Sequence, residues 1–291
     1  MLSSVYYVHQ KLLVSKYTAI VQLIYGQLTR AVSIYALSKG NKSIEKKDIP
    51  LSRGKSDIKI SYMSGVALQL SKSHKSQTFP IANVITSCLS ASSGAYLQLE
   101  ILHSGVIEVQ VSDLFLAAWL QGFTDNSRNR QRSDIDLFAS KPSFERMAMS
   151  EFSSDVFSIQ YVHARCCSLL RLAQQQKLFD CDKFLAESIP LLDNDGKLIL
   201  NHQAERRLIG SLVRLLDELE PAIARPLKWE RAALSLVKAF AIFWSECRIY
   251  DNLSPISLEL KMARIVLILA TRSAIRFLLE EKLGVSACSE L

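Results

Sequence analysis

One segment near the middle of the chain lacks the apolar side chains that a folded core requires. Residues 124 to 134 are Thr, Asp, Asn, Ser, Arg and Gln only. Such a stretch cannot bury enough apolar surface to offset its ordering entropy. It predicts a polar linker over 122–150 that separates a domain over 1–121 from a second over 151–291. Because acidic residues balance its arginines, we interpret the segment as a solvated linker rather than a phosphate-binding one.

The second domain has the pattern of a helical bundle. The chain has 291 residues, 49% of them hydrophobic, which is enough for a core in each of two domains. After residue 151 apolar residues recur at helical spacing and strand alternation is absent. Short turns rich in Pro, Asp and Gly separate the helices, which predicts antiparallel packing. The predicted helices cover 157–176, 179–188, 201–219, 227–249 and 257–282.

The first domain mixes both periodicities. Helical spacing covers 5–37, and a polar loop over 41–60 leads to a helix from about Met63 to Ser71. Two strand-like runs, 96–101 and 106–111, flank His103-Ser104-Gly105 and predict a hairpin. The expected fold class is therefore α+β and mainly α: a small N-terminal α/β domain followed by an all-α antiparallel helix bundle.

The positive charge lies in the first domain. The chain carries 35 Lys and Arg against 28 Asp and Glu, a net charge of +7. Residues 1–121 hold 12 basic and 6 acidic side chains, whereas 151–291 hold 18 of each. This balance favours an acidic partner and places the excess charge at the N-terminal end.

Signatures of catalysis, cofactors and membranes are missing. The glycines form no phosphate-binding loop, and the cysteines and histidines have no metal-ligand spacing, so we expect no cofactor and no metal. Scattered cysteines indicate buried, reduced thiols, and Asp193 to Gly196 predicts a turn. No apolar run approaches the roughly 18 residues of a membrane span. We expect a cytoplasmic protein, with an organellar location as the alternative because residues 1–44 lack Asp and Glu.

Two groups of residues suggest a binding surface. Tyr161 and Arg165 stand four apart on one predicted helix, and Phe240, Trp244 and Arg248 follow the same spacing on another. An aromatic platform beside a guanidinium suits an unstacked base and its phosphate. The same spacing also fits core packing beside a surface salt bridge, and spacing alone leaves both interpretations open.

The amino-acid sequence of the second domain resembles a known family. Phe157-Ser158-Ile159-Gln160-Tyr161-Val162-His163-Ala164-Arg165 is similar to the Q-Y-A-H-A-R signature of the DALR anticodon-binding domain of arginyl-tRNA synthetases. Further matching blocks extend the resemblance over nearly all of 151–291. A weaker resemblance links Tyr62 to Leu70 and Gly105 to Ser112 with the additional N-terminal domain of that enzyme. The resemblance implies tRNA binding through Tyr161, His163, Arg165, Phe240, Trp244 and Arg248.

The catalytic portion of the family has no counterpart in this sequence. Its H-x-G-H and K-M-S-K motifs do not occur, and about 30 residues between the two domains cannot form a nucleotide-binding sheet. We therefore expect a non-enzymatic protein that binds tRNA, in particular arginine tRNA, and presents it to a partner such as a tRNA-modifying enzyme. The alternative is a protein-interaction module whose RNA site has decayed. Val106 and Glu108, which replace the family's aromatic residue and asparagine, favour this alternative.

Overall fold

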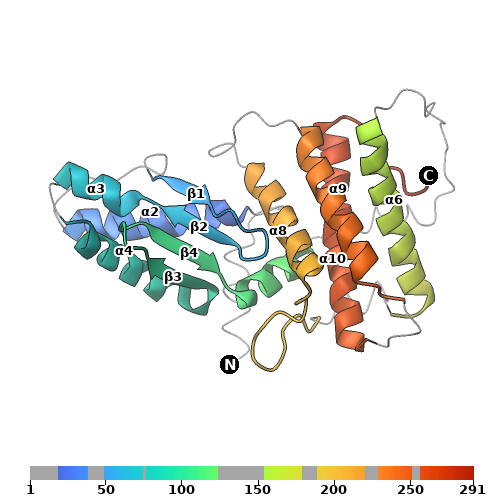
Figure 1. The fold of residues 1–291 in the computed structure, drawn as a ribbon, viewed down its shortest axis with the longest axis horizontal. Coiled ribbons are helices and arrows are strands. Elements are labelled where there is room, and N and C mark those ends of the chain that lie inside the picture. Colours follow the sequence, from blue (N-terminus) through green and yellow to red (C-terminus); the bar gives the residue numbers. More distant parts are fainter. Residues whose placement is uncertain are drawn as a thin grey trace. The chain divides into compact units, whose positions relative to one another are not determined.

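The computed structural model describes residues 19–38, 49–74, 77–123, 154–178, 189–219, 229–250 and 256–291 (Figure 1). Its chain forms two compact units. The first comprises residues 1–116 with 216–225, and the second comprises 117–215 with 226–291. Nearly all of the predicted linker and the whole predicted helix over 179–188 lie outside the described residues.

A four-stranded antiparallel sheet forms the centre of the first unit. Its strands are β1 (Leu51–Arg53), β2 (Ser61–Ser64), β3 (Leu97–Ile101) and β4 (Ile107–Val111), in the order β1-β2-β4-β3. The predicted hairpin is confirmed as β3 and β4, with Leu99 opposite Val109. The first two strands correct the sequence interpretation, which placed a loop over 41–60 and a helix from Met63. These strands have three and four residues, too few for a visible alternation.

Helices pack against this sheet and leave polar side chains on its other face. They are α2 (Ile20–Ser38), α3 (Val66–His74) and α4 (Thr78–Ser93). On β4 the side chains of Ile107, Val109 and Val111 are buried, whereas Glu108 and Gln110 between them are half-buried. This alternation is that of a sheet packed on one face, with the other face toward solvent.

Glycine is required in the turn of the hairpin. Gly105 has a φ of +79°, and its N–H donates to the carbonyl of Leu102 at 2.7 Å. A Cβ at this position would lie 2.4 Å from Cγ2 of Thr78. After β4 a helix covers residues 113–123, and Ser112 Oγ caps its start by accepting from the N–H of Phe115 at 3.2 Å.

A buried carboxylate group ties together the core of the first unit. Asp217 belongs to this unit, and its carboxylate accepts from the N–H of Val21 at 3.0 Å and from the hydroxyl of Tyr62. Arg53 Nη1 lies 3.5 Å from Oδ2. Burial raises the pKa of Asp217 to about 6, although the Tyr62, Val21 and Arg53 donors act in the opposite direction.

The second unit is helical, as the sequence predicts. Its helices are α6 (Ser154–Gln175), α8 (Gln203–Glu218, of which the residues to 215 belong here), α9 (Trp229–Glu246) and α10 (Leu258–Phe277). A π-helical turn, η4 (Leu278–Lys282), continues α10, and Gly284 with a φ of +67° follows it. All residues from Ala263 to Thr271 are buried, so α10 is the central helix.

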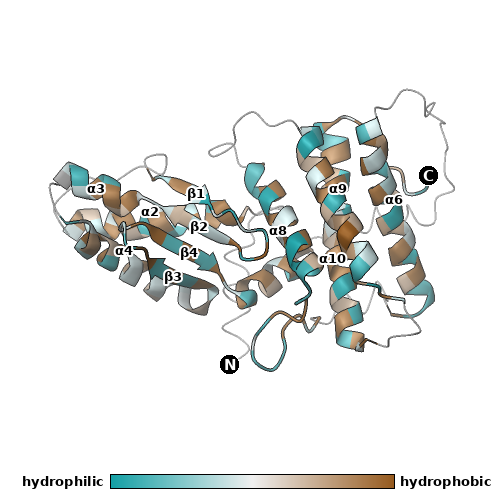
Figure 2. Ribbon diagram, in the orientation of Figure 1, coloured by the Kyte–Doolittle hydropathy of each residue, from teal (hydrophilic) through white to brown (hydrophobic). Residues whose placement is uncertain are grey.

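Helices α9 and α10 run antiparallel in this bundle (Figure 1). Arg264, near the start of α10, donates from Nη1 to the carbonyl of Arg248, which follows the end of α9, at 2.8 Å. Figure 2 shows polar and apolar residues sharing α6, α8 and α9. No helix in the described part of the chain is long and apolar enough to cross a membrane. The predicted fold class, a small α/β domain followed by a helix bundle, is confirmed.

Candidate nucleic-acid interface

Helix α6 divides the signature residues between two faces. Successive residues turn by about 100° around a helix, so residues two apart point in nearly opposite directions. Gln160 and His163 are buried, whereas Tyr161 is exposed and Arg165 half-buried. Gln160 and His163 therefore form an inward pair, and Tyr161 and Arg165 form an outward pair.

The inward pair holds the last residues of the chain along α6. Gln160 Nε2 donates to the carbonyl of Ser286 at 2.6 Å, and its Oε1 accepts from the N–H of Cys288 at 2.9 Å. Further along the helix, Arg171 Nη1 donates to Glu290 Oε1 at 2.7 Å. We call residues 284–291 the C-terminal strap.

His163 is a structural group in this arrangement. Its Nδ1 donates to the carbonyl of Cys288 at 2.7 Å, since a carbonyl oxygen can only accept. Nε2 is buried and has no hydrogen-bond partner among the described residues. Burial lowers the pKa of His163 to about 4, and the charges of Arg272 and Arg276 act in the same direction. The ring is therefore neutral at physiological pH.

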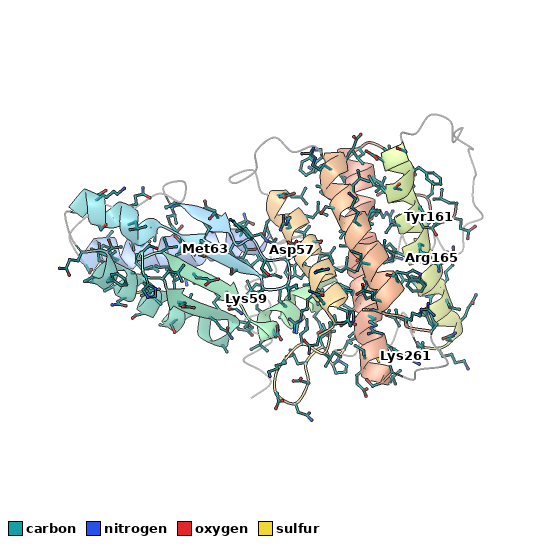
Figure 3. The ribbon with its side chains drawn as sticks, viewed as in Figure 1. Asp57, Lys59, Met63, Tyr161, Arg165 and Lys261 are labelled. Atoms are coloured by element: carbon teal, nitrogen blue, oxygen red, sulfur yellow. The ribbon has the colours of Figure 1, made fainter. Side chains whose placement is uncertain are left out.

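The outward pair presents an aromatic ring and a guanidinium (Figure 3). Tyr161 is 54% exposed, and Phe157, one turn earlier on the same face, is 40% exposed. Arg165 turns toward α9, where its Cζ lies 4.9 Å from the ring centroid of Trp244. This cation–π contact joins two residues that sequence spacing alone does not bring together.

The predicted site residues on and just after helix α9 become progressively more exposed along the chain. Phe240 is 2% exposed and packs against Phe243, with ring centroids 6.1 Å apart. Trp244 is half-buried and Arg248 is exposed. A step of four residues exceeds one helical turn by about 40°, so this row drifts from the core to the surface. The aromatic run read from the sequence thus begins inside the bundle.

A buried ion pair fixes the helices behind this surface. Arg264 Nε donates to Glu205 Oε1 at 2.7 Å, and both side chains are buried. Glu205 Oε2 also accepts from the N–H of His202 at 2.9 Å, which caps the start of α8. Because Arg264 also binds the carbonyl of Arg248, these contacts link α8, α9 and α10.

The described residues form no candidate metal site, and burial keeps three of their cysteines in the neutral thiol form. Among them, no three His, Cys, Asp or Glu side chains are placed to hold a metal ion. Cys166, Cys167 and Cys247 are buried, as predicted, and burial raises the pKa of each thiol, that of Cys247 to about 11. The prediction is wrong for the other two described cysteines, since Cys88 is half-buried and Cys288 is exposed. Asp193 Oδ1 accepts from the N–H groups of Asp195 and Lys197, so this segment is the predicted turn.

The structure divides the six predicted site residues into two groups. His163 and Phe240 are buried, so neither ring offers a face to a ligand, and both leave the predicted surface. The other four lie on α6, on α9 or just after α9, and their binding role stays a prediction. Phe157 is a residue that sequence reasoning missed, although its spacing of four before Tyr161 signals the shared face. Together Phe157, Tyr161, Arg165, Trp244 and Arg248 form what we call the α6–α9 surface.

Comparisons with known proteins agree on the C-terminal part of the chain. Residues 159–291 match the DALR anticodon binding domain. The arginine–tRNA ligase of Synechococcus sp. (strain JA-3-3Ab) is 36% identical over 138 residues, which is 47% of this chain and 22% of that enzyme. The arginine–tRNA ligase of Gloeobacter violaceus is 35% identical over 136 residues, 44% of this chain and 21% of that enzyme. The chain therefore spans about a fifth of the curated relatives that it matches. No solved structure matches it significantly.

Proposed function

We propose that the chain binds tRNA through the α6–α9 surface and has no aminoacylation activity of its own. The observation that carries this proposal is the Arg165–Trp244 contact beside the exposed rings of Tyr161 and Phe157. Aromatic faces next to a guanidinium bind unstacked bases and their phosphates. The similarity of residues 159–291 to an anticodon-binding domain supports RNA as the ligand.

Within this proposal the protein is an adaptor. It binds tRNA, with arginine tRNA as the first candidate, and presents it to a partner such as a tRNA-modifying enzyme. The similarity to arginine–tRNA ligases supports the choice of tRNA, because the matching region corresponds to their anticodon-binding domain. In this proposal the partner supplies the chemistry of tRNA modification.

The decisive experiment is recovery of RNA with the tagged full-length chain, followed by sequencing. Enrichment of arginine tRNA over other tRNAs supports the proposal. A parallel assay measures arginine-dependent ATP–pyrophosphate exchange, for which we expect no signal above buffer. If the chain recovers no tRNA and shows no saturable tRNA binding at low salt, the RNA proposal fails.

One observation favours a second candidate function, a protein-interaction module. Glu108 on β4 lies directly opposite Glu100 on β3, on the polar face of the sheet. Two carboxylates directly opposite each other on neighbouring strands repel phosphate and destabilise each other. The face is therefore poorly suited to RNA, and Glu100→Gln with Glu108→Gln should leave tRNA affinity unchanged or slightly higher. Capture of a protein partner that this double variant loses supports the second candidate.

A further inference from the structure

The exposed side of α9 carries cations beyond the aromatic surface. Between Glu230 and Glu246, residues 231–245 include two charged side chains, Arg231 and Lys238, and both are exposed. They are seven residues apart, so they share one face and lie about 10 Å apart along the helix axis. Arg248, two residues after the end of α9, is also exposed.

These three cations differ from several others in the second unit. Arg171 pairs with Glu290, Arg264 with Glu205, and Arg276 with Glu280. In contrast, no residue that the structure describes forms an ion pair or side-chain hydrogen bond with Arg231, Lys238 or the guanidinium of Arg248. Their charges are thus not neutralised within the described fold.

The acidic residues of α9 lie at its two ends. Glu230 is in the first turn, where a carboxylate interacts favourably with the helix dipole. Glu246 is in the last turn, with Oε2 3.8 Å from Nδ1 of His202. The surface between them is therefore free of carboxylates from α9 itself over about four turns.

We propose that Arg231, Lys238 and Arg248 form a track that binds the phosphates of single-stranded RNA whose bases stack on the α6–α9 surface. This inference rests on the proposed function. Trp244 lies on the same helix as Lys238 and Arg231, about 120° and 140° around the helix axis from them. A strand whose bases stack on Trp244 therefore reaches these two cations by passing over the exposed side of α9. A separation of about 10 Å along the helix axis places Arg231 and Lys238 on different phosphates. Cations that follow the backbone, combined with aromatic rings that stack on the bases, are typical of single-stranded nucleic-acid sites.

The test is the salt dependence of binding, measured with unfractionated tRNA and with an unstructured RNA oligonucleotide. Each phosphate contact contributes a slope of about 0.7 to log Kd against log salt for single strands. Lys238→Ala and Arg231→Ala should each reduce the slope by about this amount, and the double variant by about twice as much. Lys238→Arg should keep the slope of the wild type.

Lys197→Ala is the matched control. It removes the same charge from an exposed residue in the turn that follows Asp193. We expect Lys197→Ala to show the same salt dependence as the wild type. A loss of slope equal to that of Lys238→Ala would overturn the proposed track. Trp244→Ala should weaken binding and leave the slope unchanged.

Two failures are distinguishable. If Lys238→Ala and Arg231→Ala retain the full slope while Trp244→Ala weakens binding, the track is wrong and the proposed function stands. If the wild type itself shows no saturable binding to either RNA, the proposed function fails and the track fails with it. Unchanged melting temperatures of the variants confirm that the comparison is between folded proteins.

Discussion

The guanidinium of Arg165 on α6 lies over the indole ring of Trp244 on α9, 4.9 Å from its centroid. The two residues are 79 positions apart in the sequence, so the contact is made by the fold. Arg165 covers one ring and is thereby held in a fixed orientation. In the proposed function, a base that binds here would find a guanidinium already positioned on the same helix face as the exposed ring of Tyr161.

The first prediction separates stacking from packing on α9. Trp244→Ala should weaken RNA binding roughly five- to a hundredfold, because a stacked base contributes about 1–3 kcal/mol. Since Trp244 is half-buried, we expect only a partial loss of stability. Titration of labelled tRNA and thermal melting of the same samples measure both effects.

Phe240→Ala is the control for this experiment. Its ring lies one turn away on the same helix and is buried, so truncation should cost about 3–5 kcal/mol of unfolding free energy. The folded fraction should still bind RNA. If the two variants lose affinity equally at equal folded fraction, the distinction between the surface ring and the core ring is wrong.

The second prediction concerns His163 and acidic pH. Its pKa of about 4 in the folded protein lies below the ordinary value of 6.5, so the folded state favours the neutral ring. The free energy of unfolding is therefore at its full value above pH 6.5 and falls as the pH drops toward 4. The loss reaches about 3 kcal/mol at most. Chemical denaturation of wild type and His163→Asn across this range should show the difference, and parallel pH profiles would contradict it.

Asp217 should give the opposite pH dependence. Its pKa is raised to about 6 from the ordinary 3.8, so the folded state holds the proton more tightly than the unfolded chain. This contribution is present below pH 3.8 and is lost as the pH rises through 6, by about 3 kcal/mol. Relative to Asp217→Asn, the wild type should become less stable as the pH rises over this interval. A constant difference between the two proteins would refute the assignment.

The fourth prediction concerns the hairpin turn of the first unit. Gly105→Ala should destabilise this unit by at least about 1–2 kcal/mol, because a non-glycine residue at positive φ is strained. The added Cβ also meets Cγ2 of Thr78. Thr78→Ser removes that methyl group and should relieve part of the cost in a double-mutant cycle. Additive effects in denaturant titrations would show that the close approach is unimportant.

The sequence predicts the elements whose signal is local. The β3–β4 hairpin is recognisable because its strands alternate on either side of a glycine turn. Strand β2 pairs with β4, Ser61 opposite Gln110, across 49 residues, and no neighbouring residue signals that pairing. The helices of the second unit follow from periodicity, since each buries one face along its length.

The candidate site was predictable in part for the same reason. Spacing places Tyr161 and Arg165 on one face of α6, and the structure leaves that face outward. The burial of His163 follows from its two-residue offset, and that of Phe240 from the 40° drift of each four-residue step. Neither burial was predicted, because the resemblance names the motif residues without saying which face of the helix each one occupies. The Arg165–Trp244 contact depends on how α6 and α9 pack, which spacing within either helix does not encode.

The C-terminal strap also determines when the second unit can fold during synthesis. Gln160 contacts residues 126 and 128 positions later, and His163 one that is 125 positions later. Until those residues leave the ribosome, the buried amide and imidazole of α6 lack the partners that satisfy them in the finished fold. The second unit therefore cannot reach its native state cotranslationally before residue 288 has emerged, and truncated nascent chains should expose this side of α6 to chaperones.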